Sequence, residues 1–166
     1  MNLIVAADEN WGIGKDGGLL THLPGDMKYF RETTRGHVVV MGRKTLESFP
    51  DGKPLKNRTN LVLTRNEEYH PQGVAVCRSI EEALKLLEQY SKEDIFVIGG
   101  GTIYRQLLPY CKKAYVTHIY KAFQADTDFE NLDQSPQWKL TSVSDRQEHN
   151  GIGYEFRIYE RVEETE

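Results

Sequence analysis

The sequence has no long hydrophobic run and no surplus of positive charge. Its longest apolar runs extend over about five residues, whereas a helix that spans a bilayer needs about 20. The chain enters an expected strand almost at once, without the basic segment and apolar core of a signal peptide. The net charge is -4, whereas a nucleic-acid-binding protein would need a basic face. These absences predict a soluble cytoplasmic protein that binds neither nucleic acid nor membrane.

Common metal and hydrolase motifs are also missing. Cys77 and Cys111 stand far apart and form no C-x-x-C pair, so we expect reduced, half-buried thiols in a reducing compartment. The five histidines form no ligand pair at helical spacing. The sequence contains no H-E-x-x-H motif, EF-hand loop or G-x-S-x-G motif. We therefore expect no metal centre.

Several short segments are apolar on consecutive residues, which is typical of strands buried on both faces of a parallel sheet. They are 3–7, 38–41, 61–63, 74–76 and 95–98. Helices are expected between them, at 24–33, 43–49, 79–90 and 102–108. After Lys113 apolar and polar residues alternate, as in strands with one solvated face. The sequence predicts a single α/β domain over residues 1–166, with a mostly parallel sheet of about eight strands, an antiparallel C-terminal edge and about four flanking helices.

Residues 12–17 read GIGKDG, which matches G-x-G-x-x-G by letter. A dinucleotide-binding fingerprint needs these glycines at the turn between a strand and a helix. Here the residues DENW separate them from the strand, and the next helix is expected only near Pro24. We expect a flexible loop, or a mobile lid over a site.

A second glycine motif, VVVMGRKT at 38–45, leads from a buried strand directly into a helix. Arg43 and Lys44 stand at the helix N-terminus, where cations oppose the dipole unless an anion such as phosphate offsets them. A solvated basic turn is the alternative. A Walker A loop is excluded, because the spacing is wrong and Arg43 interrupts the order G-K-T.

Gly99–Gly101 join another buried strand to a helix, and glycines there let the backbone approach a ligand closely. A tight structural turn is the alternative, although one glycine normally suffices for it. Thr64 and Arg65 end a third strand. Ligands of an open parallel sheet lie outside the carboxyl ends of its strands. The three strand ends therefore predict a site for an extended anion with several phosphates, in which Arg43 and Arg65 fork a phosphate monoester.

Asp26 stands in the first turn of the helix expected from Pro24, beside Leu23, Met27 and Phe30. One interpretation is an exposed acid that favours the helix dipole by about 0.3–1 kcal/mol. Phe30 lies four residues after Asp26 and so shares its helix face. The other interpretation is therefore that the apolar neighbours of Asp26 partly exclude water from its carboxylate. This desolvation would raise the pKa of Asp26. Such an acid would hold a protonated or cationic heterocycle by two hydrogen bonds.

Seven segments, in order from about Leu3 to Tyr159, resemble dihydrofolate reductase of the bacterial chromosomal type. They are LIVAADENWGIGKDG, LPGDMKYFRETT, VVVMGRKTLESF, LKNRTNLVLTR, FVIGGGTIYRQLLP, YVTHI and DTDF. The resemblance implies NADPH-dependent reduction of 7,8-dihydrofolate to 5,6,7,8-tetrahydrofolate, which supplies one-carbon metabolism. It further implies a monomer that binds dihydrofolate and antifolate-type small molecules and needs no obligate protein partner.

The resemblance also implies the substrate site. Asp26 would be the catalytic carboxylate, which hydrogen-bonds the pterin ring and supports protonation at N5 through water while a hydride moves to C6. Thr117 would support Asp26 by a side-chain hydrogen bond, and Arg58 would pair with the glutamate carboxylate of the substrate. The other implied substrate-binding residues are Ile4, Val5, Ala6, Met27, Phe30, Phe49, Leu55, Ile98 and Tyr104.

For the cofactor, the resemblance implies that Arg43, Thr64 and Arg65 bind the 2′-phosphate of NADPH. It also implies a cis peptide bond between Gly99 and Gly100, and a mobile loop, GIGKDGGLL, that closes over the nicotinamide. The remaining implied cofactor-binding residues, including those at the pyrophosphate, are Ala6, Ile13, Gly14, Gly17, Leu19, Gly42, Lys44, Thr45, Leu63, Ile98, Gly99, Gly100, Gly101, Thr102, Ile103 and Tyr104.

One dipeptide departs from the family pattern, which has Pro-Trp before x-L-P-x-D where this chain has Leu20-Thr21. The small Thr21 motivates a second hypothesis, a reductase of another pterin or of a pyrimidine on the same fold. Arg58 argues against it, because only a folate needs a tail-binding arginine. A third hypothesis is a non-catalytic NADP- or folate-binding protein whose pocket has decayed at these two positions.

Overall fold

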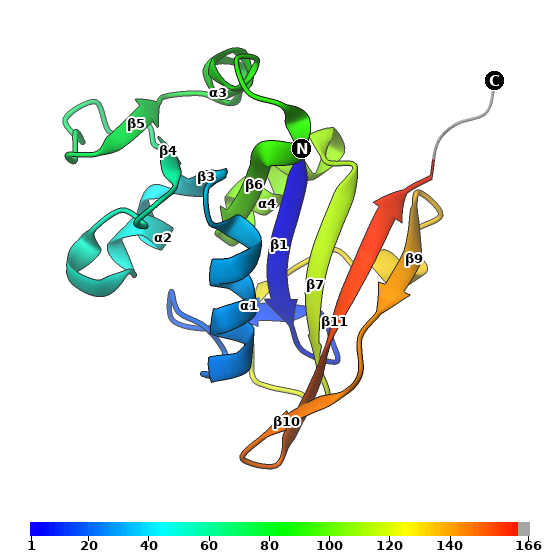
Figure 1. Cartoon of the computed structure of the whole chain (residues 1–166). Coiled ribbons are helices and arrows are strands. Elements are labelled where there is room, and N and C mark those ends of the chain that lie inside the picture. The colour runs from blue at the N-terminus through cyan, green and yellow to red at the C-terminus, as the bar shows by residue number, and fades with distance from the viewer. Residues whose placement is uncertain (163–166) are drawn as a thin grey trace.

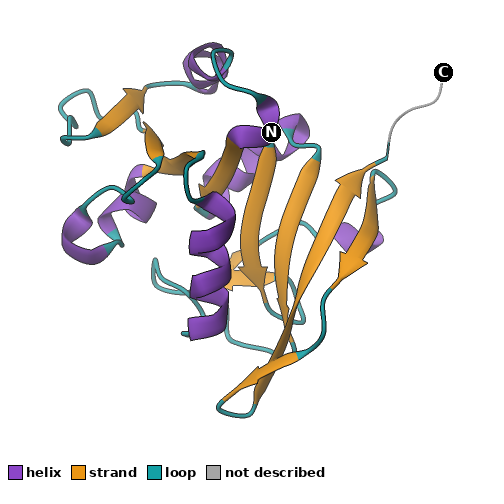
Figure 2. Ribbon diagram, in the orientation of Figure 1, coloured by secondary structure: helices purple, strands orange, loops and turns teal. Residues whose placement is uncertain are grey.

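The computed structural model, which describes residues 1–162, has one large sheet flanked by helices (Figures 1 and 2). In spatial order the strands are β10 (Gln147–His149), β11 (Ile152–Arg161), β7 (Lys113–Ile119), β1 (Asn2–Ala7), β6 (Ile95–Gly99), β3 (Val38–Gly42), β4 (Thr59–Leu63) and β5 (Val74–Cys77). All neighbours from β7 to β5 are parallel. β11 runs antiparallel to β7, β10 and β9 (Trp138–Val143). The expected parallel sheet with an antiparallel C-terminal edge is confirmed, and residues 163–166 of the expected domain lie outside the described chain.

Helices cover both faces of the sheet, which explains why its strands are apolar on consecutive residues. Along β1, Leu3 and Val5 point into one core cluster and Ile4 into another. The cluster around Ile4 is covered by α1 (Pro24–Thr34) and α2 (Arg43–Glu47). The cluster around Leu3 is covered by α3 (Ile80–Leu87) and α4 (Gly101–Leu107). Figure 1 shows α1 in front of the sheet, with its axis roughly along the strands.

Local chemistry explains where α3 begins and where α2 ends. Ser79 caps α3, since its hydroxyl accepts a hydrogen bond from the Glu82 N–H at 3.1 Å. The Glu82 carboxylate accepts from the N–H of Arg78, one residue before the position of a capping box. The helix expected over 43–49 ends already at Glu47. The reason is Pro50, which keeps the preceding residue extended, at φ −76° and ψ 158°.

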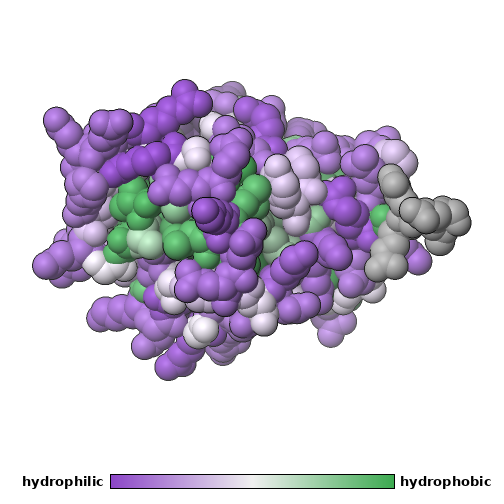
Figure 3. Space-filling view, turned by 90° about the horizontal axis from the view of Figure 1, so that it is seen from above, coloured by the Kyte–Doolittle hydropathy of each residue, from purple (hydrophilic) through white to green (hydrophobic). Residues whose placement is uncertain are grey.

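The G-x-G-x-x-G segment forms part of a small second sheet. Its residues Gly12–Gly14 are β2, which pairs antiparallel with β8 (Thr127–Asp128). Cys77 and Cys111 are free thiols, but the expectation that they are half-buried was wrong, because the core around α3 and α4 encloses both. Among residues 1–162, no helix has the length and apolar content needed to cross a membrane. Seen from above, hydrophilic side chains dominate the surface and apolar area is confined to patches between them (Figure 3).

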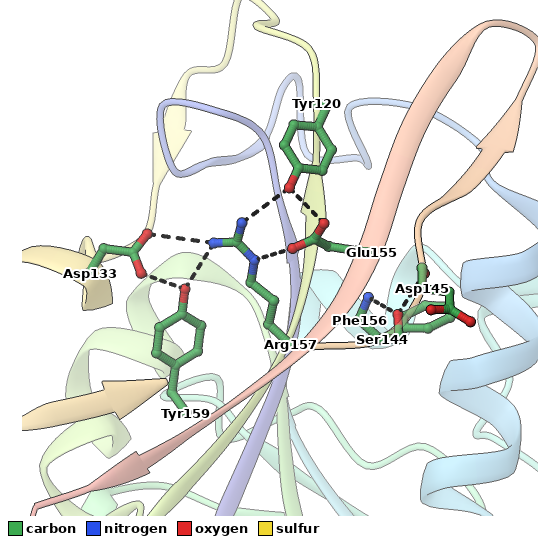
Figure 4. A network of polar contacts seen from close by, with 8 residues as sticks. All are labelled: Tyr120, Asp133, Ser144, Asp145, Glu155, Phe156, Arg157 and Tyr159. Carbon is green, nitrogen blue, oxygen red and sulfur yellow. Dashed lines mark hydrogen bonds and ion pairs between the residues drawn. The ribbon is translucent and has the colours of Figure 1, made fainter. Parts of the chain in front are cut away.

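A polar network strengthens the antiparallel end of the sheet (Figure 4). Arg157 donates from Nε to Glu155 at 2.7 Å, and the Tyr120 hydroxyl donates to the same carboxylate at 2.6 Å. The Tyr159 hydroxyl donates to Asp133 at 2.7 Å. Burial alone would raise the pKa of Glu155, but the bonds from Tyr120 and Arg157 outweigh it and lower that pKa. The network therefore holds a charged pair at this end and ties β11 to β7.

Candidate functional site

The carboxyl ends of three neighbouring strands meet at one edge of the sheet. β6, β3 and β4 lie side by side and parallel, so their last residues, Gly99, Gly42 and Leu63, lie at that same edge. α2 begins directly after Gly42, and α4 begins after Gly100. A Cβ added at Gly100 would lie 3.5 Å from Thr45 Oγ1 on α2. Two helix N-termini therefore lie close together, as an extended anion requires.

The glycine loop lies against the turn that starts α4. A Cβ at Gly101 would lie 2.5 Å from Cγ2 of Thr127, and Gly14 is the strand partner of that threonine. Asp126 holds the loop, because its carboxylate accepts from the N–H of Asp16 at 2.8 Å. The peptide bond between Gly99 and Gly100 is cis, as the resemblance implies. The loop and the triple-glycine turn thus border the same space.

The three residues that the resemblance places at the 2′-phosphate of NADPH differ in whether their polar groups already have a partner in the protein. Arg65 is exposed after β4, and among residues 1–162 it makes no ion pair. Arg43 pairs with Glu47 at 3.0 Å on α2 through Nη1, which leaves its other N–H groups for a phosphate. Thr64 accepts a backbone hydrogen bond at its hydroxyl and remains free to donate its proton.

Sequence reasoning missed Arg78, which lies beside this strand end. Its guanidinium donates to the backbone carbonyls of Asn66 and Glu67, and so it holds the turn that follows Arg65. A signal was present in the sequence, because Arg78 directly follows β5, the strand next to β4, and Arg65 lies two residues after β4.

The Asp26 carboxylate lies in the first turn of α1 and reaches β7. The Thr117 hydroxyl on β7 donates to Asp26 Oδ1 at 2.5 Å. Within residues 1–162, Thr117 is the only hydrogen-bond donor to this carboxylate, so Oδ2 is left for a ligand. Burial raises the pKa of Asp26, and the bond from Thr117 opposes that rise. The partly desolvated acid, rather than the exposed helix-start acid, is what the structure contains.

An apolar wall continues from Asp26 along the same face of the sheet. It belongs to a single packed cluster that includes Ile4, Phe30, Phe49, Leu55 and Ile98. The backbone carbonyls of Ile4 and Ile98 both lie 2.8 Å from the buried hydroxyl of Tyr104. That hydroxyl links the middle of β1 to the end of β6, beside the glycine turn, and its burial raises the pKa of Tyr104.

Arg58 lies at the far end of this wall. Its Nε donates to the Thr34 hydroxyl at 2.9 Å, and Nη1 donates to the Lys56 carbonyl at 2.9 Å. Thr34 is itself fixed, because its hydroxyl donates to the Phe30 carbonyl at 2.8 Å. The guanidinium carbon lies 5.9 Å from the centre of the Phe30 ring. Arg58 is therefore held in place with N–H groups to spare for a carboxylate.

Some expected contact residues do not present their side chains to this space. Val5, Leu63 and Ile103 point into the core cluster on the other face of the sheet. Ala6 packs against the cluster of Leu23 and Tyr154. The side chains of Leu19 and Met27 are 66% and 37% exposed. The family resemblance identifies positions in the sequence. In a strand, the pleat decides which face of the sheet the side chain at each position reaches.

Comparison with known proteins decides the family. Residues 1–161 match the family model described as dihydrofolate reductase. The chain belongs to the dihydrofolate reductase family. Dihydrofolate reductase of Bacillus subtilis (strain 168) is 41% identical over 163 residues, which cover 97% of this chain and 94% of the relative. The enzyme of Staphylococcus haemolyticus is 40% identical over 166 residues, covering 98% of this chain and 96% of the relative.

A solved dihydrofolate reductase has the same architecture. The enzyme from Enterococcus faecalis, complexed with NADP(H) and RAB-propyl, matches with a TM-score of 0.86 at 35% identity. The match covers 98% of this chain and 96% of that chain. Family membership, the α/β fold and its antiparallel C-terminal strands are thereby confirmed.

Thr117→Val is expected to shift the pH dependence of this reductase upward. The hydrogen bond from Thr117 is the influence that lowers the pKa of Asp26, so without it burial raises that pKa further. The pH profile of kcat/KM for dihydrofolate should show its Asp26-dependent transition at higher pH. Thr141→Val, at an exposed threonine of β9, is the control and should leave the profile in place. An unmoved transition in Thr117→Val would mean that the profile does not report Asp26.

Proposed function

We propose that this protein reduces 7,8-dihydrofolate to 5,6,7,8-tetrahydrofolate with NADPH and thereby supplies one-carbon metabolism. One observation carries the proposal. A carboxylate with a raised pKa, Asp26, lies at the start of an apolar wall that shares a sheet edge with two helix N-termini. That combination suits a cationic or protonatable heterocycle next to a phosphate-bearing cofactor. Membership of the dihydrofolate reductase family over residues 1–161 supports the same activity.

The residues at the glycine-rich edge fit NADPH. A Cβ at Gly101 would lie 2.5 Å from Cγ2 of Thr127, so this position has no room for a side chain, whereas a Cβ at Gly100 would make an ordinary contact with Thr45. Glycine at position 101 therefore keeps a close-packed turn that the backbone can present to a pyrophosphate. We assign the pyrophosphate to this turn and to the start of α2, and the 2′-phosphate to Arg43, Thr64 and Arg65. When bound there, NADPH supplies the hydride that C6 of the pterin receives.

The chain's own residues bind, orient and protonate the substrate. Asp26 accepts hydrogen bonds from the pterin, and its raised pKa keeps a proton available for N5 through water. The wall formed with Phe30 and Phe49 excludes bulk water from the ring. Arg58 pairs with the carboxylate at the end of the substrate and so fixes its direction. The same arrangement suits the protonated ring of an antifolate-type inhibitor.

We also propose a cytoplasmic location and function without an obligate protein partner. Cys77 and Cys111 are free and buried in the core, which suits a reducing compartment. Gel filtration of the active enzyme tests whether it is a monomer. It should elute at an apparent mass close to the 19.1 kDa of one chain.

The loss of NADPH absorbance in the presence of dihydrofolate tests the main proposal. Turnover supports the reductase. Turnover with another pterin or a pyrimidine, but not with dihydrofolate, would favour the second hypothesis raised by Thr21. Tight NADPH binding without turnover of any of these substrates would favour a non-catalytic binding protein.

Arg65→Gln is expected to raise the KM for NADPH about tenfold, because a hydrogen bond between charged groups contributes about 1.5–3 kcal/mol. The KM for NADH, which lacks the 2′-phosphate, should change little. Lys139→Gln, which removes an exposed charge on β9, serves as the control. Equal weakening of both cofactors would contradict the assignment of Arg65 to the 2′-phosphate.

A further inference from the structure

Asp8 is a buried carboxylate that the proposed mechanism does not use. It follows β1 directly, and only 1% of the residue is exposed. Within residues 1–162, no lysine, arginine or histidine lies at ion-pair distance from its carboxylate. Burial of a carboxylate is costly unless other polar groups take the place of water around it. Its hydrogen-bond partners therefore show what holds it in the fold.

Three backbone N–H groups surround this carboxylate. Oδ1 accepts from Asn10 at 2.9 Å and from Gly12 at 2.8 Å, and Oδ2 accepts from Phe123 at 2.9 Å. Hydrogen bonds to a carboxylate are stronger than those between two neutral groups. The two oxygens of Asp8 therefore tie two segments of the chain together.

These segments carry the two strands of the small sheet. Gly12 begins β2, and Phe123 lies on the path from β7 to β8. Bonds to Asn10 and Gly12 alone would close a local turn, but the bond to Phe123 joins positions 115 residues apart. A Cβ added at Gly12 would lie 2.5 Å from Cβ of Ala125, so the segments touch beside the carboxylate. Asp8 thus fixes how β2 lies against the segment that leads to β8.

The turn from Asp8 to Gly12 is also fixed in the core. The Asp8 N–H donates to the Gly12 carbonyl at 2.9 Å, and the Trp11 N–H donates to the Asp8 carbonyl at 3.0 Å. Trp11 has a left-handed conformation with φ 61°, which is uncommon outside glycine. Its buried ring stacks on Phe129, with 6.2 Å between the ring centres. The entry to the glycine loop (residues 12–20) is therefore held by both backbone and side chains.

The small sheet borders the proposed cofactor site. Gly14 pairs with Thr127 across β2 and β8, and the Cγ2 atom of Thr127 lies against Gly101. Gly101 begins α4, in the turn to which we assign the pyrophosphate. A shift of β2 relative to β8 would therefore move the glycine loop relative to this turn.

We infer that Asp8 is a positioning residue for hydride transfer, because its carboxylate joins β2 to the segment before β8 and holds the glycine loop at the cofactor site. The inference rests on the proposed function, which assigns NADPH to this edge of the sheet. Asp126 also holds the loop, but its side chain is exposed, so water competes for its bond to Asp16. Water does not compete in this way for the buried bonds of Asp8, which therefore define the loop position more firmly.

Asp8→Asn tests this role with little change in shape. An amide has one acceptor oxygen and one N–H₂ group, so it can accept from the loop entry or from Phe123 but not from both. The bridge is thereby broken on one side. Single-turnover hydride transfer at saturating NADPH and dihydrofolate should slow about tenfold to a hundredfold, since small misplacements have effects of this size. The KM for dihydrofolate should change little, because Arg58 and the apolar wall are untouched.

Cofactor binding shows whether the effect is confined to the loop. The dissociation constant of NADPH should rise about fivefold to tenfold in Asp8→Asn, as the loss of one hydrogen bond to a charged group would give. That of 2′,5′-ADP, which has the 2′-phosphate but no nicotinamide, should not change. Amide hydrogen exchange should become faster in residues 9–18 and 121–128, whereas exchange in β3 and β4 should stay as in the parent.

Asn2→Ala is the matched control. Asn2 is buried at the other end of β1, and its side chain donates to the Glu93 carbonyl at 2.9 Å, 91 positions away. The variant also loses a long-range bond from a buried side chain, but far from the glycine loop. It should lower Tm and keep the parent values of hydride transfer and NADPH binding. Equal losses in Asn2→Ala and Asp8→Asn would mean that Asp8 acts through stability alone and would overturn the inference.

Gly12→Ala disturbs the same junction while Asp8 stays in place. Its methyl group collides with Ala125 and separates the two segments. The variant should slow hydride transfer and weaken NADPH binding while 2′,5′-ADP binding stays unchanged, and it provides the test if Asp8→Asn does not fold. Parent values of hydride transfer and NADPH affinity in either folded variant would contradict the role of Asp8.

Failure of the proposed function gives a different result. If the parent does not turn over dihydrofolate, NADPH dissociation constants and amide exchange still compare Asp8→Asn with the parent. An unchanged NADPH affinity then overturns the role of Asp8 alone. A parent protein that does not bind NADPH overturns the proposed function, and this role with it.

Discussion

Asp26→Asn is expected to lower kcat/KM for dihydrofolate about a hundredfold to a thousandfold at neutral pH, since a positioned acid or base contributes about 10²–10⁴-fold. The amide still accepts the hydrogen bond that Thr117 donates at 2.5 Å, so the change removes charge and proton transfer while the geometry is kept. Asn cannot keep a proton available for N5, and it leaves a cationic ring unpaired. The loss should therefore fall on the hydride-transfer step.

The pH profile separates this role from a structural one. At low pH part of the substrate is already protonated at N5 in solution, so the rate of Asp26→Asn should rise again toward the rate of the parent enzyme. Single-turnover measurements of NADPH oxidation across the pH range provide the comparison. Asp145→Asn, at an exposed acid near the antiparallel end of the sheet, is the control and should match the parent. An Asp26→Asn enzyme as fast as the parent at neutral pH would remove Asp26 from the proposed mechanism.

Arg58→Leu should raise the KM for dihydrofolate about tenfold to a hundredfold while kcat changes little, because a charge-assisted hydrogen bond contributes about 1.5–3 kcal/mol. Arg58 is already held by the Thr34 hydroxyl and the Lys56 carbonyl, so it loses little side-chain entropy when it binds a carboxylate. The cost of the mutation therefore falls on ground-state binding. The KM for NADPH should not change.

A substrate without the glutamate is the sharpest control for Arg58. Its KM should be the same in the parent enzyme and in Arg58→Leu, because it has no carboxylate for the arginine to bind. Arg58→Lys keeps the charge but loses the fork of N–H groups. Its KM for dihydrofolate should therefore lie between that of the parent enzyme and that of Arg58→Leu. A thermal melt checks whether the loss of the Thr34 contact destabilises α1. If the shortened substrate suffers the same rise in KM, Arg58 acts through the fold and not through the tail.

Much of this architecture was predictable because its signals are local. Runs of consecutive apolar residues mark strands covered on both faces, and alternation after Lys113 marks the antiparallel edge. Ser79 marks the start of α3, because its hydroxyl caps the helix. Glycines at the ends of buried strands mark the turns at Gly42 and Gly99–Gly101, and parallel strands bring such turns to one edge. The identity of the family followed from the same segments read in order.

The remaining features depend on contacts between residues far apart in the chain. Asp26 lies on α1 and Thr117 on β7, 91 positions apart, and only the packing of α1 against the sheet brings them within a hydrogen bond. The family resemblance implied this contact, but residue type and spacing did not. The ion pair between Arg43 and Glu47 follows from their i, i+4 spacing on a helix. The approach of Arg43 to Thr64 and Arg65 depends on the pairing of β3 with β4.

By itself, then, the sequence determined the elements, the family and the candidate positions, since these depend on residue type and spacing. The tertiary structure decided which side chains meet. It placed Val5 on the far face of the sheet and Arg78 against the turn that follows Arg65. The physical reason is that strand order and register set distances between distant residues, and no local propensity encodes them.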